Sequence, residues 1–321
     1  MNKPKVSVII PVYNSREYIG HCLESLLHQT LQDIEIICVD DGSTDGSGDI
    51  LEEYSRKDSR VIVLHQENAG AGAARNYGLR ESRGKYLSFL DSDDFFEPEM
   101  LEKGWKTLVH FKADFVVLGS DMYFMDTKEY VQNPWVLHKN ELPPYMPFKY
   151  RELTGNVFKT FVGWAWDKMY RKEFVLEHRL TFQEQRTSND LLFVFSALVT
   201  AKRIAVNRRI LIHQRRGGGK SLSVTREKSW WCFYDALLAL RQRLYDENIY
   251  WELERDYINY ALHFSLWNLK TVVEPTKTMI AEKLCGEWFD ELGVTGKPKE
   301  YFYEEEEYRE YLKVTSDYKR A

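Results

Sequence analysis

The sequence predicts an α/β protein: a doubly wound, mostly parallel sheet followed by a helical C-terminal extension. In the first 120 residues, short apolar runs alternate with segments whose apolar residues recur at helical spacing. This alternation is typical of a parallel sheet with helices on both faces. After residue 225 only the helical spacing continues. We therefore expect one domain over residues 1–224, with halves at 1–119 and 120–224, and a helical region over 225–321.

The composition is that of an ordinary globular protein, with 321 residues, 44% hydrophobic and 29% charged. A formal net charge of −5 gives no basic surface, so we expect no nucleic-acid partner. The cysteines lie far apart and form no metal-binding spacing, which favours reduced thiols in a cytoplasmic protein. A strand begins within the first ten residues and leaves no room for a signal peptide. No apolar run approaches the roughly 18 residues that span a bilayer.

The elements of the first half follow from runs of β-branched and apolar residues and from helical periodicity. Ser15 is a candidate N-cap for the first helix. We expect strands at 6–12, 34–39, 61–64, 85–90 and 113–118, and helices at 18–27, at 47–54 and around Arg75 and Leu79.

The second half is less regular, and residues 120–160 give no clear pattern. Beyond them we expect a strand running into a helix at 167–174, a helix at 189–198 and a strand at 209–214. In the tail, five apolar residues recur at spacings typical of a helix that packs on another helix, in the tail or in a second subunit. They are Trp230, Phe233, Leu237, Leu240 and Leu244.

Polar residues directly follow four of the predicted strands. They lie at 11–14, at Asp40 and Asp41, at Asn68, and at 91–94. In a doubly wound sheet, ligands bind beyond the carboxyl ends of the strands. The sequence therefore predicts a nucleotide-like ligand at this edge.

The turn at 91–94 holds three carboxylates in four residues: Asp91, Asp93 and Asp94, with Ser92 between the first two. Such crowding is unfavourable near a core unless a cation or hydrogen-bond donors compensate. Carboxylate oxygens suit Mg²⁺ or Mn²⁺, ions that also hold phosphates. The alternative is an acidic turn that caps the next helix, since Pro98 suits a first helical position.

Five motifs in order resemble glycosyltransferase family 2, whose members are nucleotide-sugar transferases of the GT-A fold. The resemblance covers roughly residues 5–225 and implies a GT-A-type sheet in which 1–119 binds the nucleotide and 120–224 the acceptor. It also implies a divalent cation, Mn²⁺ or Mg²⁺. The motifs are Pro11-Val-Tyr-Asn14, Val39-Asp-Asp-Gly-Ser-Thr-Asp45, Asn68-Ala-Gly70, Ala74-Arg-Asn76 and Phe89-Leu-Asp-Ser-Asp-Asp94.

The resemblance implies roles for individual residues on the donor side. Asp41 would accept a hydrogen bond from the base, commonly uracil, and Asp93 would lie most directly on the metal, with Asp91 near the ribose. The remaining donor-side positions are Pro11, Val12 and Tyr13 along the nucleoside, Asn68 and Arg75 on the nucleotide and diphosphate side, and Ser92 within the acidic turn.

The resemblance also implies a general base. In this family it is an aspartate, usually in a Glu-Asp pair that opens a helix, and Ser188-Asn-Asp-Leu-Leu-Phe193 matches with Asp190 as the base. Asn189 departs from the usual glutamate. The alternative is a helix N-terminal acid stabilised by the dipole, which would depress the pKa of Asp190 and make it a weaker base.

On the acceptor side, the resemblance points to Trp164, Trp166 and Asp167. The tryptophans could stack on a sugar face or belong to the core, and Asp167 is a rival to Asp190. Further on, Arg215 and Arg216 precede Gly217–Lys220. This basic segment is similar to a mobile lid over the diphosphate; the alternative is a solvated strand and turn.

Together these features imply an inverting, metal-dependent glycosyltransferase that moves a sugar from a UDP-sugar to an acceptor hydroxyl in surface polysaccharide synthesis. The acceptor would be a saccharide or a lipid-linked saccharide; the latter would bring the tail to the inner face of the membrane. The C-terminal helices are candidates for a homodimer contact. Two other classes stay open: a non-catalytic sugar-nucleotide-binding or assembly subunit, and a nucleotidyltransferase.

Overall fold

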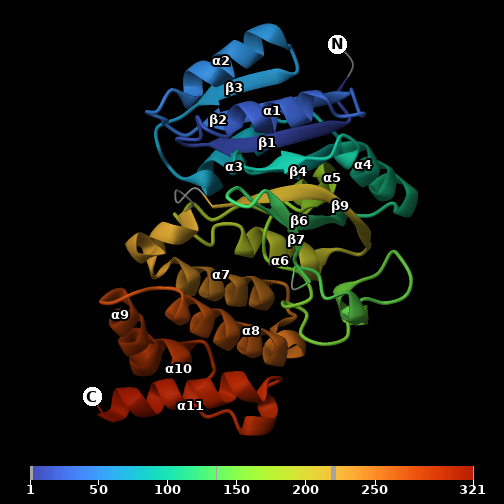
Figure 1. Cartoon of the computed structure of the whole chain (residues 1–321). Coiled ribbons are helices and arrows are strands. Elements are labelled where there is room, and N and C mark those ends of the chain that lie inside the picture. Colours follow the sequence, from blue (N-terminus) through green and yellow to red (C-terminus); the bar gives the residue numbers. More distant parts are fainter. Residues whose placement is uncertain (1–2, 135, 218–221, 321) are drawn as a thin grey trace.

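The computed structural model describes residues 3–134, 136–217 and 222–320. These residues form a nine-stranded sheet with helices on both faces (Figure 1). In sheet order the strands are β3 (Val61–His65), β2 (Ile34–Asp40), β1 (Val6–Val12), β4 (Tyr86–Phe89), β8 (Lys168–Arg171), β6 (Phe115–Phe124), β9 (Ile204–Arg216) and β5 (Phe95–Phe96), and β7 (Glu129–Gln132) pairs with β6.

The first four strands of this order are mutually parallel, as the strand–helix alternation predicts. β8 then enters antiparallel between β4 and β6, while β6 and β9 run parallel to each other. Most of the sheet is therefore parallel, and the predicted fold class is confirmed. β8 matters for function because it carries residues 168–171 alongside the strand that ends in the acidic turn.

The helices were mostly foreseen, with shifted ends. α1 begins at Ile19, and Ser15 is not its N-cap: the Ser15 hydroxyl hydrogen-bonds Ser92 Oγ at 2.7 Å instead. The helices are α1 (Ile19–Leu27), α2 (Ser47–Lys57), α3 (Ala71–Glu81), α4 (Met100–Phe111), α5 (Lys172–Glu177), α6 (Leu191–Thr200), α7 (Cys232–Asp246), α8 (Tyr250–Lys270), α9 (Thr276–Lys283), α10 (Phe289–Glu291) and α11 (Glu305–Arg320).

Four strands differ from expectation, and one of them, β6, runs six residues past the predicted end at residue 118. β5 and β7 were missed because one has two residues and the other is exposed throughout, so neither carries a buried apolar run. β9 is longer than the predicted 209–214 segment. Its pairing with β6 shifts register beside Gly119, where an added Cβ would lie 2.4 Å from the Arg209 carbonyl oxygen.

The C-terminal helices stack beneath the sheet, with α7 on α6, α8 on α7 and α11 on α8 (Figure 1). Four residues of the predicted seam, Phe233, Leu237, Leu240 and Leu244, are buried in this stack. The seam therefore packs within the chain. In the part of the chain that the structure describes, no helix combines the length and apolarity that crossing a membrane requires.

Candidate active site

The polar loops after the parallel strands meet at one edge of the sheet. Asn14 Oδ1 accepts a hydrogen bond from the Thr44 amide at 2.8 Å, which joins the loops after β1 and β2. Asn68 Nδ2 donates to the Asp41 carbonyl at 3.0 Å and brings in the loop after β3. The hydrogen bond between Ser15 and Ser92 adds the loop after β4. The predicted convergence of these loops is confirmed.

The residues expected along the nucleoside differ in what they expose. Pro11 and Val12 are buried, whereas Tyr13 is 47% exposed beside them. Asp41 is buried, and its carboxylate accepts hydrogen bonds from Gln66 Nε2 at 2.7 Å and from the amides of Ala69 at 2.8 Å and Gly70 at 2.9 Å. Asp41 therefore shapes the loop after β3. A nucleobase that bonds to Asp41 would have to share or replace these hydrogen bonds.

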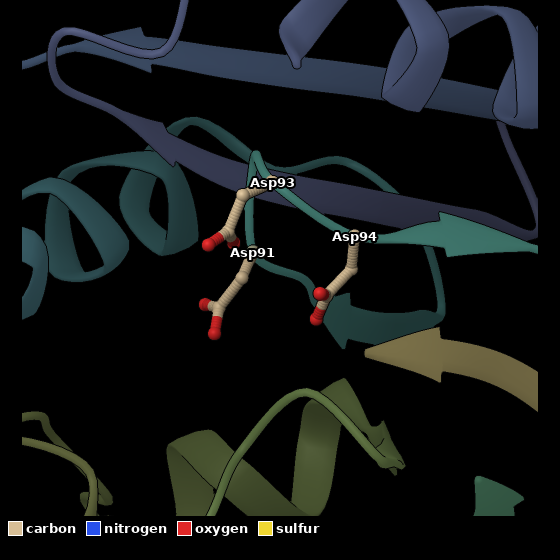
Figure 2. A group of neighbouring side chains, drawn as sticks. All are labelled: Asp91, Asp93 and Asp94. Atoms are coloured by element: carbon tan, nitrogen blue, oxygen red, sulfur yellow. The ribbon is translucent and has the colours of Figure 1, made fainter. Parts of the chain in front are cut away.

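The acidic turn brings its three carboxylates together, with oxygens of Asp91, Asp93 and Asp94 all within 4.8 Å of one another. Figure 2 shows them on the turn after β4, directed to the same side. Burial and, to a lesser extent, the charge of Asp91 raise the pKa of Asp93 to about 6. Burial also raises the pKa of Asp94, as do Asp93 and Asp91. The turn thus holds more negative charge than its surroundings compensate.

This turn fits a divalent cation better than a helix cap. α4 begins at Met100, and the Leu101 amide in its first turn donates to Gln29 Oε1 at 2.9 Å and not to a carboxylate of the acidic turn, so the capping alternative is wrong. Asp94 Oδ1 accepts the Arg215 amide at 2.9 Å, whereas Asp94 Oδ2 is buried without a hydrogen-bond partner among the described residues. Hard oxygen donors with unmet charge are the ligand set that Mg²⁺ or Mn²⁺ prefers.

Arg75 connects this turn to Asn189. Its side chain is 6% exposed; Nη2 donates to Asp91 Oδ1 at 2.6 Å and Nη1 donates to Asn189 Oδ1 at 2.8 Å. The predicted base, Asp190, is the next residue. Residues far apart in the sequence are thus joined through one guanidinium.

Asp190 is the N-cap residue of α6, yet its carboxylate makes no capping hydrogen bond to the described helix. Burial raises its pKa to about 6; Arg75 and Lys168 lower it, and the charge of Asp91 raises it. The expected depression of this pKa by the helix dipole is therefore wrong in direction, because desolvation outweighs it. A carboxylate with this pKa is ionised at neutral pH and is still basic enough to accept a proton.

The acceptor-side residues lie differently from expectation. Asp167 and Lys168 form a buried ion pair at 2.6 Å, with 0% and 1% of the side chains exposed. Trp166 is also buried and stacks on Trp164 with centroids 5.0 Å apart. Asp167 and Trp166 therefore cannot contact an acceptor in this conformation, and Trp164 is the partly exposed residue of the three.

The basic segment is described only as far as Gly217; Gly218–Lys220 lie outside the described residues. Arg215 lies over the rings of Phe95 at 4.9 Å and Tyr18 at 5.6 Å. The charges of Arg215 and Arg216 both lower the pKa of Asp93. Positive charge therefore adjoins the acidic turn, as predicted, although the described part of this segment is the end of β9.

Two features of the site escaped sequence reasoning. Lys168 donates to the carbonyls of Val162 at 3.0 Å and Trp164 at 2.8 Å besides pairing with Asp167. The signal in the sequence was a lysine that directly follows Asp167 at the start of a strand-like run. The second is a cavity of about 390 Å³ beside the acidic turn, to which five separate elements contribute. Its lining residues are His21, Phe95, Tyr123, Met125, Tyr130 and Arg215.

Comparison with known proteins identifies the family that shares this architecture. The model of the family described as "Glycosyl transferase family 2" matches residues 7–178. The chain belongs to this family. EpsH of Bacillus subtilis is 38% identical over 218 residues, which cover 67% of this chain and 62% of EpsH. The chain thus spans less than two thirds of that relative's length.

Solved structures of the same fold extend the likeness to the C-terminal helices. Residues 1–349 of Staphylococcus aureus TarS superpose with a TM-score of 0.63 and 21% identity, covering 98% of this chain and 92% of that one. The mannosyltransferase PcManGT of Pyrobaculum calidifontis gives a TM-score of 0.56 with 15% identity, covering 98% and 85%. At these identities the likeness establishes the fold, which is that of GT-A glycosyltransferases.

Proposed function

We propose that this protein is an inverting, metal-dependent glycosyltransferase that moves a sugar from a nucleotide-sugar, preferentially a UDP-sugar, to an acceptor hydroxyl. The observation that carries the proposal is that an acidic turn whose charge is only partly compensated is linked, through Arg75 and Asn189, to the segment that carries Asp190, a separate carboxylate with a raised pKa. The acidic turn is suited to a cation at the leaving diphosphate, and Asp190 is suited to the attacking hydroxyl. Family membership supports this division of roles.

Asp190 would act as the general base. It would take the proton of the acceptor hydroxyl as that oxygen attacks the anomeric carbon from the face opposite the diphosphate, which inverts the configuration. Its pKa of about 6 leaves it ionised at neutral pH. Inversion itself is inferred from the family and not from any distance in the site.

Asp91, Asp93 and Asp94 would hold the divalent cation, which when bound would neutralise the negative charge growing on the diphosphate. Arg215 and Arg216 would add positive charge on the same side, since both act on Asp93. The loops around Tyr13, Asp41 and Asn68 would enclose the nucleoside. Asp41 would do so mainly by fixing the amides of Ala69 and Gly70.

The ligands of the structural neighbours support the choice of donor and metal. TarS was solved with UDP-GlcNAc, and the P. calidifontis enzyme with GDP-mannose and Mn²⁺. Both ligands are nucleoside diphosphate sugars, which supports a donor of this class. A transfer assay should therefore include UDP-sugars and GDP-mannose.

The test is release of nucleoside diphosphate from a panel of these donors with Mn²⁺ and saccharide acceptors. We expect Asp190→Asn to lower kcat on the order of 100-fold or more, because the base is lost while the side-chain volume stays. Nucleotide affinity should be nearly unchanged. Asp290→Asn, at an exposed position on α10, is the matched control and should retain wild-type kcat.

Each departure from this result has a distinct meaning. Full turnover by Asp190→Asn would reject Asp190 as the base. Release of pyrophosphate would identify a nucleotidyltransferase. Tight donor binding with neither transfer nor donor hydrolysis would identify a non-catalytic sugar-nucleotide-binding subunit.

A further inference from the structure

α3 holds the segment that leads to Asp190. The Asn76 side chain exchanges two hydrogen bonds with the backbone of Phe182, each 2.9 Å long. At Gly72, an added Cβ would lie 2.0 Å from the Gln183 carbonyl oxygen, so the backbones touch. The Gln183 amide donates to the Asn189 carbonyl at 3.0 Å and closes the segment into a loop. The base-bearing loop is therefore anchored to a helix of the nucleotide-binding half.

Arg75 anchors this loop at Asn189, the residue directly before the predicted base Asp190. Its guanidinium is almost fully buried, lies 5.4 Å from the centroid of the Phe182 ring, and spends its two terminal nitrogens on Asp91 and Asn189. Reaching a diphosphate would require breaking one of these bonds inside a buried site. The geometry thus argues against the direct nucleotide contact expected for Arg75.

Because Asn189 supplies a hydrogen-bond acceptor, Arg75 bonds both the acidic turn and the loop that carries Asp190. The family usually has a glutamate at this position, whose side chain is one methylene longer than that of asparagine. The amide oxygen of Asn189 accepts the Nη1 hydrogen, and an aspartate would present an oxygen at the same distance from the backbone. Arg75 therefore keeps its charge paired with Asp91 while it still holds the loop.

We propose that Arg75 is a positioning residue that sets the placement of Asp190 relative to the acidic turn through its paired bonds to Asn189 and Asp91. This inference rests on the proposed function of Asp190 as base. It assigns Asn189 a role as the acceptor that completes the link.

The test compares Asn189→Ala, which removes the acceptor oxygen, with Asn189→Asp, which keeps an oxygen at the same place. Arg80→Gln, at an exposed position on the same helix, is the control. Hydrogen–deuterium exchange of the peptide 183–190 reports the loop directly and does not depend on activity. The peptide 86–95 reports the acidic turn, and kcat and the donor KM are measured in parallel.

We expect Asn189→Ala to speed exchange in 183–190 on the order of tenfold, as loss of a buried hydrogen bond implies. Exchange in 86–95 should stay within twofold, kcat should fall about tenfold and the donor KM should stay within twofold. Asn189→Asp should restore the protection of 183–190, and Arg80→Gln should match wild type.

Unchanged exchange in Asn189→Ala would overturn the inference, as would equal loss of protection in the Ala and Asp variants. Faster exchange with unchanged kcat would overturn the claim that the link serves the base. A wild-type protein that transfers no sugar would instead refute the proposed function, while the exchange comparison would still decide whether Arg75 and Asn189 fix the loop.

Discussion

At the scale of single residues, burial decides which carboxylates can do chemistry. Asp190 and Asp93 are both partly shielded from water, and both have a pKa of about 6. They differ in their neighbours: Arg75 and Lys168 act on Asp190, whereas Asp93 lies in a cluster of carboxylates. The first environment suits a proton acceptor and the second suits a cation.

The raised pKa of Asp190 predicts the acidic limb of the pH–rate profile. A general base acts when it is deprotonated, so with Asp190 in the proposed role kcat should rise with pH through about 6 and level off above about 7. The measurement is kcat against pH at saturating donor, acceptor and Mn²⁺. A limb near pH 4, the range of an ordinary aspartate, would contradict the buried environment of Asp190.

The acidic turn predicts metal-coupled nucleotide binding. Mn²⁺ should tighten UDP binding to the wild-type protein, and Asp93→Ala should abolish that metal dependence in calorimetry. Because Asp93 has a pKa of about 6, the cation must displace a proton at lower pH. The coupling should therefore be weaker at pH 5 than at pH 7. Asp290→Asn is again the control, and unchanged coupling in Asp93→Ala would reject the assignment.

At the scale of elements, β8 shows how a strand inserted into the sheet supports the site. It enters between β4 and β6 and brings a buried ion pair, Asp167 with Lys168, next to the end of β4. Lys168 also donates to two backbone carbonyls, so its charge is well compensated. Its charge lowers the pKa of Asp190. The pair thus contributes to both the packing and the electrostatics of the site.

Breaking this pair should destabilise the protein. Asp167→Asn would leave a buried ammonium without its counter-charge, and we expect the free energy of unfolding to fall by about 3 kcal/mol. The ion pair of Arg171 with the exposed Glu173 is the comparison. Glu173→Gln should change the free energy of unfolding by less than about 1 kcal/mol. Urea unfolding followed by circular dichroism measures both. A stable Asp167→Asn protein with a raised acceptor KM would instead restore an acceptor role for Asp167.

At the scale of the whole molecule, the apolar core crosses the predicted boundary at residue 224. One buried cluster joins Ile9 of β1 and Phe89 of β4 to Phe193 of α6, Leu240 of α7 and Phe302 near α11. A second cluster lies on the other face of the sheet, under α1 and α4. The C-terminal helices therefore complete the core beneath the sheet as well as extending the chain (Figure 1).

A shared core predicts cooperative unfolding. Residues before and after 224 should lose structure in one transition, so tryptophan fluorescence and far-ultraviolet circular dichroism should give the same urea midpoint. Exchange mass spectrometry at that midpoint should show peptides from α6 and α8 unfolding together. Separate midpoints for the two regions would show that the helical tail is an independent unit.

Sequence patterns were sufficient where the physics is local. The alternation of apolar runs with helical periodicity predicted the parallel half of the sheet. The positions of the strand ends predicted which polar loops meet at its edge. The acidic turn was recognisable because three crowded carboxylates need compensation wherever they lie. Short or exposed strands such as β5 and β7 carried no comparable signal, and neither did the insertion of β8 between β4 and β6.

By itself, the sequence determined the fold class, the edge of the sheet that holds the site, and the candidate carboxylates Asp93 and Asp190. The tertiary structure alone decided that Arg75 faces Asp91 and Asn189, that Asp167 is buried against Lys168, and that the pKa of Asp190 is raised. The reason is physical: periodicity follows from local backbone geometry, whereas burial and charge pairing depend on residues that are distant in the chain.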